Sequence, residues 1–306
     1  MTSQNPTKDQ HFVPRLYLKN FASEDSHLEV LNIKEKRLGK RRPYQGLGYA
    51  HFYYAAKTGI SDELSQHVEA WLGSIEDFIS KQLPRIIAEI LGNGRIQDDD
   101  RYVLSVLMSM LWLRTPGMRT QLKESEEGIA KEIEKLHGSK NAEHFKSEDN
   151  IQHLKLMVNS TGLDGPGFAN MFFNMKWKVY IARGTEFFIT SDSPVVEKWL
   201  PPKGIYGASF LERDKYFPLT PNILLELTYP RGTAKIKRET LYEADNYVIK
   251  SLNIIIASGA DSFVYSGNKE PLEKLLAGRE NPGRLEREYI EKYEIPWAEY
   301  RERMGK

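Results

Sequence analysis

Four side chains that could carry chemistry stand in apolar blocks far apart along the chain: His11, Glu69, Glu76 and Asp192. A histidine can act near neutral pH as an acid, a base or a metal ligand. Carboxylates can hold a divalent cation that activates water. If the fold brings the four together, they suit metal-assisted hydrolysis of a phosphodiester or nucleotide substrate, and we predict them as catalytic residues.

Three arginines and a serine are the candidate substrate-binding residues: Arg15, Arg114, Arg119 and Ser191. Arg114 and Arg119 flank a Pro-Gly break, where their guanidinium groups could grip a phosphate or carboxylate through paired hydrogen bonds. Ser191 belongs to a hydroxyl-rich run directly after an expected strand, and such loops often bind ligands. The cofactor that the predicted hydrolysis would need is a divalent cation.

The same residues also have a structural interpretation. The His11 ring could bond a backbone carbonyl and pin the start of the chain, and Glu69 and Glu76 could each pair with an arginine such as Arg114. Residues 190–194 match a turn closed by an Asp or Ser side chain before proline. On this interpretation the chain is a non-catalytic ligand-binding or interaction module with a structural ion-pair network. The sequence leaves both interpretations open.

The chain is predicted to begin with a short helix and a hairpin. Pro14 suits the first turn of a helix that ends near Phe21. The segments Leu28–Ile33 and Leu38–Arg42 predict a hairpin, and Tyr49–Ala55 could supply a third strand.

A layer of helices should position Glu69, Glu76 and the arginines. Apolar residues recur at helical spacing over residues 61–93, where Pro84 should kink or split the helix. Further helices are expected at 98–113, 121–136 and 148–158. The helix at 98–113 is apolar nearly all round and should lie at the centre of the layer.

The second half of the chain is predicted to be richer in strands. Trp177–Ile181 and Glu186–Thr190 flank an Arg-Gly-Thr turn and predict a hairpin. Additional strands are expected at 216–218, 223–228 and 262–265, and helices at 239–257 and 271–277. Aromatic residues recur in the charged tail after Arg284, which suggests that the tail docks on the body or mediates self-association.

This order predicts an α+β fold, with a helical layer at about residues 61–158 packed on a mostly antiparallel sheet and a small N-terminal hairpin. We expect one large domain over residues 1–306. The alternative is a subdivision into a helical half, 1–160, and a sheet-containing half, 161–306.

Composition excludes several classes of protein. The 306 residues include no cysteine, so disulfides, thiolate metal sites and cysteine nucleophiles are absent. The 43 basic and 42 acidic residues nearly cancel, which argues against a protein that coats DNA. The basic run 34–42 could still contact nucleic acid or a nucleotide, although a solvated strand edge explains it better. Common nucleotide-binding loops and serine-hydrolase motifs are also missing.

No segment is predicted to enter a membrane. The most apolar stretch, 103–113, is far shorter than the roughly 20 residues that span a bilayer, and the first ten residues lack a secretory signal pattern. We therefore expect a soluble protein of the cytoplasm.

Several blocks together resemble the family known as domain of unknown function 4238, whose members are uncharacterised and mostly bacterial. The opening block, His11–Phe21, matches the family pattern H-x-V-P-x-x-Y-L-x-x-F. The later blocks are Phe52-Tyr53, the spacing of Glu69 and Glu76, Arg114–Arg119, Phe188–Val195 and Phe217–Pro221. The resemblance covers most of the chain and implies a fold group, without an established activity.

Overall fold

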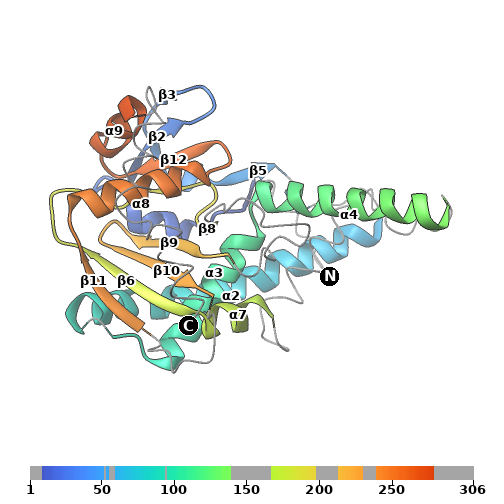
Figure 1. Ribbon diagram of the computed structural model, residues 1–306, viewed down its shortest axis with the longest axis horizontal. Coiled ribbons are helices and arrows are strands. Elements are labelled where there is room, and N and C mark those ends of the chain that lie inside the picture. Colours follow the sequence, from blue (N-terminus) through green and yellow to red (C-terminus); the bar gives the residue numbers. More distant parts are fainter. Residues whose placement is uncertain are drawn as a thin grey trace, which may run out of the picture.

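The computed structural model describes residues 9–51, 53–54, 59–93, 95–138, 167–197, 213–229 and 239–278, and leaves the side chains of residues 59–69, 93, 125, 126 and 129 undescribed. Helices pack on mostly antiparallel sheets in the body of the protein, and one long helix projects from it (Figure 1). The predicted α+β class is confirmed.

The N-terminal segment is fastened by a small sheet and a glycine. Strand β1 (Asp9–His11) pairs antiparallel with β5 (Tyr49–His51). The Gly48 carbonyl accepts hydrogen bonds from the backbone N–H groups of Phe12 and Val13. Gly48 has a φ of 65°, and a Cβ there would lie 2.8 Å from the Cβ of Val13, so only glycine fits without strain.

The expected short helix and hairpin are present. Helix α1 (Arg15–Leu18) follows Pro14 and continues into a 3₁₀ turn, η1 (Lys19–Phe21). Strands β2 (His27–Asn32) and β3 (Arg37–Leu38) form the hairpin, and β4 (Arg42–Pro43) also pairs with β2. The third strand, β5, is shorter than expected and pairs with β1 instead of the hairpin.

One sheet joins the two ends of the described chain. Its strand order is β3-β2-β12-β7, where β12 is Phe263–Ser266 and β7 is Thr190–Ser191. Because β12 lies between β2 and β7, it brings the N-terminal hairpin beside the segment that carries Asp192.

A second sheet has the order β11-β6-β10-β9-β8, and only the β11–β6 pair is parallel. The strands are β11 (Glu239–Ala244), β6 (Lys176–Ala182), β10 (Ile223–Thr228), β9 (Lys215–Thr220) and β8 (Val196–Glu197). Alternate side chains point to opposite faces. One face packs with α3 (Asp98–Leu113) and α7 (Phe168–Asn174) into one core, and the other packs on α8 (Asn246–Ser258).

The helical layer consists of α2 (Gly59–Asn93), α3 and α4 (Pro116–His137). Helix α3 is buried over most of its length, as its apolar sequence predicts. Helix α2 runs continuously through Pro84, so of the two expected effects of this proline, a kink or a split, the split does not occur. None of the described helices carries a stretch long and apolar enough to cross a membrane.

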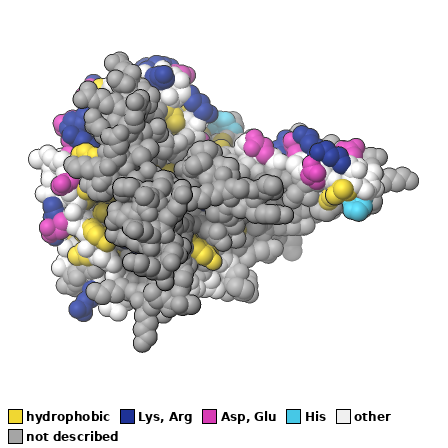
Figure 2. Space-filling view, in the orientation of Figure 1, with side chains coloured by type: hydrophobic (Ala, Val, Ile, Leu, Met, Phe, Trp, Pro, Cys, Tyr) yellow, Lys and Arg dark blue, Asp and Glu magenta, His cyan; other side chains and the backbone are white. Residues whose placement is uncertain are grey.

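Helix α4 projects from the body (Figure 1). Charged side chains of both signs line this projection (Figure 2). Its first turn instead lies against the body, next to the turn between α8 and β12, because the Gly117 N–H binds the side chain of Asp261. The N-terminal end of α4 therefore takes part in a junction of several elements.

The predicted hairpin of 177–181 with 186–190 is wrong. Strand β6 pairs with β10 and β11, whereas β7 pairs with β12 in the other sheet. The intervening backbone is held by side chains of α8: Asn246 accepts hydrogen bonds from the N–H groups of Thr185 and Glu186, and Asn253 accepts one from Ile189. These amide side chains replace a strand partner.

The predicted helix over 239–257 is also partly wrong, because its first six residues form β11. Asp245 ends the strand and caps the helix, since its Oδ1 accepts a hydrogen bond from the Val248 N–H at 2.9 Å. Helix α9 (Glu270–Gly278) matches the expected last helix. The helix expected at 148–158 and the aromatic tail lie outside the described residues.

Candidate functional site

Arg114 is the centre of a buried network at the C-terminal end of α3. Its Nε donates to the Tyr54 hydroxyl at 2.7 Å, and its Nη1 donates to the Glu76 carboxylate at 2.5 Å. Its Nη2 donates to the backbone carbonyl of His11, which also accepts from the Tyr54 hydroxyl. Arg114 thus joins α2, α3 and the N-terminal strand, and all three sides of its guanidinium have protein partners.

The imidazole of His11 lies beside this network and takes part in other contacts. Its Nε2 is 3.2 Å from the Gln45 carbonyl and 3.2 Å from Arg15 Nε, so a neutral ring either donates to the first or accepts from the second. Burial lowers the pKa of His11, and the Arg15 and Arg114 charges lower it further, against the Gln45 carbonyl. These effects favour the neutral form of the ring.

Two predicted residues of the helical layer remain, Arg119 and Glu69. Arg119 Nη1 donates to the Tyr53 carbonyl at 3.0 Å, and its guanidinium lies over the Tyr53 ring. The side chain of Glu69 lies outside the described part of the structure.

Asp192 is a buried carboxylate at the end of β7. Its Oδ1 accepts a hydrogen bond from the Asp261 N–H at 2.9 Å, and its Oδ2 accepts from the Ser262 and Phe263 N–H groups at 2.8 and 2.9 Å. The carboxylate therefore organises the turn that leads into β12. The adjacent Ser191 hydroxyl accepts a hydrogen bond from the Ser193 N–H at 3.1 Å, which forms the turn predicted for this run.

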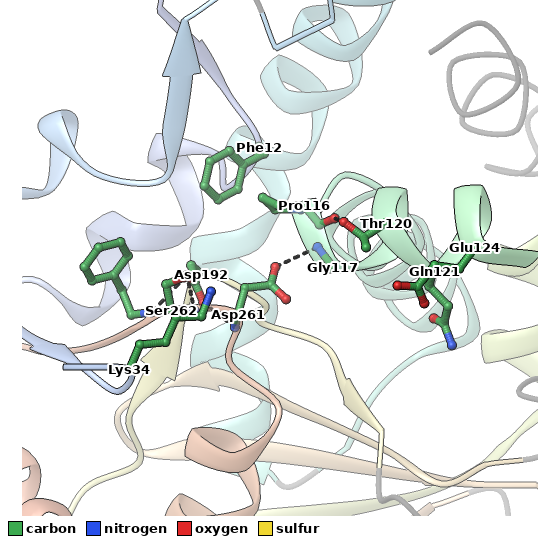
Figure 3. Close-up of a pocket in the computed structure, with 11 residues that line it drawn as sticks. Phe12, Lys34, Pro116, Gly117, Thr120, Gln121, Glu124, Asp192, Asp261 and Ser262 are labelled. Carbon is green, nitrogen blue, oxygen red and sulfur yellow. Dashed lines mark hydrogen bonds between the residues drawn. The ribbon is translucent and has the colours of Figure 1, made fainter. Parts of the chain in front are cut away.

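A pocket of about 470 Å³ opens beside this turn (Figure 3). It lies where the β2–β3 hairpin, the first turns of α4 and the α8–β12 turn meet. Its lining combines apolar side chains with carboxyl, hydroxyl, amide and ammonium groups: Phe12, Lys34, Pro116, Gly117, Thr120, Gln121, Glu124, Asp192, Asp261, Ser262 and Phe263.

Asp261 binds the first turn of helix α4. Its Oδ2 accepts a hydrogen bond from the Gly117 N–H at 2.8 Å. A Cβ at Gly117 would lie 2.2 Å from Asp261 Oδ1, so the absence of a side chain there allows the approach. A carboxylate is favourable at this place because the N-terminal end of a helix carries partial positive charge.

The charge of Asp261 affects the titration of Asp192. Burial and the Asp261 charge raise the pKa of Asp192 to about 7, although its three N–H donors favour the ionised form. Burial also raises the pKa of Asp261, against the Gly117 N–H and the charge of Lys34. Carboxyl groups with raised pKa values in a cleft are typical of functional sites, although buried structural groups show them too.

The structure divides the predicted site residues into two groups. His11, Glu76 and Arg114 belong to the ion-pair network, whereas Asp192 lines the pocket, whose lining includes none of those three. The nearest link between the groups is Phe12, which follows His11 and lines the pocket. The placement of these residues does not test their predicted roles, which stay predictions.

Sequence reasoning missed Asp261, and it considered Lys34 only as part of the basic run 34–42. Asp261 stands in a Gly-Ala-Asp-Ser turn ahead of a strand, a weak signal by itself. Its partner Gly117 is 144 residues away, and no local pattern links the two. Among the described residues, no group of three or more histidine, aspartate or glutamate side chains is placed to hold a metal ion.

Comparison with known proteins identifies a family and nothing further. The model of a family described as "Protein of unknown function (DUF4238)" matches residues 9–270. No curated protein and no solved structure matches the chain significantly.

Proposed function

The chain belongs to the DUF4238 family, whose description names no activity, and we propose that it is a non-catalytic ligand-binding module. The ligand would occupy the pocket beside Asp192 and Asp261. The observation that carries the proposal is the composition of this pocket: aromatic and proline side chains together with a few polar and charged groups. A volume of about 470 Å³ lies within the range of small-molecule sites.

The arrangement of the other candidate residues supports binding over catalysis. Phosphodiester hydrolysis by the predicted set needs His11, Glu76 and Asp192 around one substrate. Instead, Glu76 is paired with Arg114, and His11 contributes its backbone carbonyl to the same guanidinium. These contacts fix the N-terminal segment whose next residue, Phe12, forms part of the pocket. On this proposal the network is a support for the binding site.

The proposal is tested by screening the purified protein with a fragment library that contains amines, carboxylates, phosphates and neutral molecules. Binding is followed by ligand-observed NMR for the wild type and for Thr120→Trp, which places an indole at the pocket from the exposed surface of α4. The matched control is Lys131→Trp, an exposed position of the same helix. We expect binding that Thr120→Trp abolishes and Lys131→Trp preserves. Binding unaffected by Thr120→Trp would contradict the proposal.

A parallel assay tests the hydrolase prediction. The protein is incubated with DNA, RNA and nucleotides in Mg²⁺ or Mn²⁺, beside His11→Ala and Asp192→Asn variants. If the chain is a non-catalytic binding module, none of the three proteins should hydrolyse DNA, RNA or nucleotides. Turnover by the wild type that either variant abolishes would make the chain a hydrolase and overturn the proposal. The predicted nucleic-acid or nucleotide partner and self-association through the tail stay predictions.

A further inference from the structure

We propose that the pocket binds an organic cation, an amine with an apolar body, whose ammonium group lies at the carboxylate of Asp261. This inference rests on the proposed function, because it names the ligand class of the same pocket. Four features of the lining carry it: an available carboxylate oxygen, an excess of acidic groups, a helix end already occupied by a carboxylate, and apolar walls.

The first feature is the Asp261 carboxylate itself. Figure 3 shows it directed toward Gly117 at the start of α4, with Lys34 on its other side. Gly117 occupies Oδ2. Within the described part of the chain, Oδ1 accepts no hydrogen bond. Since Asp261 is only half-buried and lines the pocket, an ammonium N–H could reach this oxygen.

The second feature is charge. The lining carries the carboxyl groups of Asp192, Asp261 and Glu124 against the single ammonium group of Lys34. An excess of carboxylates in a cleft attracts a cation and repels a phosphate or carboxylate ligand. The carboxyl groups of Asp192 and Asp261 are also hard to ionise as they stand. A cation beside them would stabilise their ionised forms.

The third feature concerns the N-terminal end of α4. Such helix ends bind phosphate groups when their N–H groups are open to a ligand. Here the Gly117 N–H is bonded to Asp261, and the Met118 N–H donates to the Thr115 hydroxyl. A phosphate would have to displace a carboxylate that belongs to the chain. The helix end therefore holds the acceptor for a cation and is closed to an anion.

The fourth feature is the apolar part of the lining, formed by Phe12, Pro116 and Phe263. Aromatic faces attract ammonium groups and also cover hydrocarbon. A metal ion gains no binding energy from apolar side chains. Among the described residues, no three metal-ligating side chains are placed to hold one. The hydroxyl oxygen of Ser262 in the lining could accept a further N–H bond. An amine with an aromatic or alkyl body uses all of these groups.

The test is isothermal titration of the full chain with 2-phenylethylamine, using 2-phenylethanol and phenylacetate as probes of the same shape with neutral and negative head groups. We expect the amine to bind and phenylacetate not to bind. Asp261→Asn keeps an oxygen that can accept from the Gly117 N–H but loses the charge, and it should weaken amine binding at least about tenfold. The control Asp77→Asn, an exposed residue paired with Lys81 on α2, should leave the affinity unchanged.

Two further variants should change the affinity for the amine in opposite directions. Lys34→Met removes the single positive charge of the lining and should tighten amine binding severalfold. Glu124 lies on the exposed surface of α4, so a substitution there does not disturb the core. Glu124→Gln should weaken amine binding about two- to threefold. Because these variants do not depend on Asp261, they keep the inference testable if Asp261→Asn fails to fold.

The outcomes separate the inference from the proposed function. Tighter binding of phenylacetate or inorganic phosphate than of the amine, or weaker amine binding by Lys34→Met, overturns the cationic ligand and leaves a binding pocket of another class. Absence of amine binding at millimolar concentration overturns the inference. If no fragment binds in the library screen either, the proposed function fails with it.

Discussion

Asp261 Oδ2 accepts a hydrogen bond from the backbone N–H of Gly117 at 2.8 Å, across 144 residues of sequence. This bond joins the turn ahead of β12 to the start of α4. It places a carboxylate of the chain at the positive end of the helix, in the wall of a pocket. The bond therefore has two consequences, one for stability and one for the ligand that the pocket accepts.

Replacing Gly117 by alanine should break this relationship. The added Cβ would lie 2.2 Å from Asp261 Oδ1, so the carboxylate must move and the hydrogen bond is lost. We expect a loss of about 1–2 kcal/mol in the free energy of unfolding, measured by urea denaturation. The control is Gly128→Ala in the same helix, where a Cβ meets nothing within 4 Å. The control should be stabilised by up to about 1 kcal/mol. Equal stability of the two variants would contradict the account.

Tyr17 locks the opening motif to the segment that carries Asp192. Its buried hydroxyl donates to the Pro218 carbonyl at 2.6 Å and lies 2.7 Å from the Thr190 hydroxyl. Tyr17→Phe leaves both partners buried, and we expect it to cost about 1–3 kcal/mol in urea denaturation. Tyr49→Phe, at an exposed ring, should change stability by less than about 0.5 kcal/mol. A Tyr17→Phe protein as stable as the Tyr49→Phe control would show that the Tyr17 hydroxyl does not hold these two segments together.

The Arg114 network should be far more sensitive to substitution than a surface ion pair. Arg114→Met leaves the Glu76 carboxylate without its arginine partner and the His11 carbonyl with the Tyr54 hydroxyl as its remaining donor, and we expect a loss of about 3–5 kcal/mol. The matched control is Arg183→Met, which breaks an exposed pair with Glu243 and should cost at most about 1 kcal/mol. Both are measured by chemical denaturation. Similar losses in the two variants would mean that the network does not hold the N-terminal segment.

Asp192 should make the stability of the protein depend on pH. Its pKa is raised from 3.8 to about 7, so between these values the folded protein holds a proton that the unfolded chain releases. The contribution of this group is complete below about pH 4 and is lost as the pH rises toward 7, by at most about 1.4 kcal/mol per pH unit. Asp261 and Tyr265 face the same carboxyl group, and both remain in the variant used for comparison.

The measurement is the free energy of unfolding of the wild type and of Asp192→Asn at pH 5 and pH 7. We expect the advantage of the wild type over the variant to shrink as the pH rises. An advantage that grows with pH would show that the three N–H donors to Asp192 outweigh burial and the neighbouring Asp261 charge.

Elements whose pattern is local could be predicted from the sequence. The central helix α3, the opening helix after Pro14 and the β2–β3 hairpin follow from periodicity, proline and turn residues. The expected hairpin of 177–181 with 186–190 could not be predicted correctly, because the backbone of Glu186 and Ile189 is bonded to the Asn246 and Asn253 side chains on α8. Interactions between an amide side chain and a distant backbone leave no periodic signal.

The candidate site was predictable only in part, for a similar reason. Asp192 is conspicuous in the sequence as a carboxylate among hydroxyls, and it does line the pocket. His11 and Arg114 are conspicuous too, yet they meet each other through a backbone carbonyl, a contact that residue type does not encode. Asp261 becomes recognisable only when the fold sets it against Gly117, since both of its local neighbours are ordinary turn residues.

The most direct test of the central claim is a crystal structure of the protein with 2-phenylethylamine. The account predicts the ammonium nitrogen within about 3 Å of the Asp261 carboxylate, the phenyl ring against Phe12 or Phe263, and the bond from Asp261 to Gly117 intact. An amine bound elsewhere on the protein, or an anion beside Lys34 with Asp261 displaced from Gly117, would contradict it.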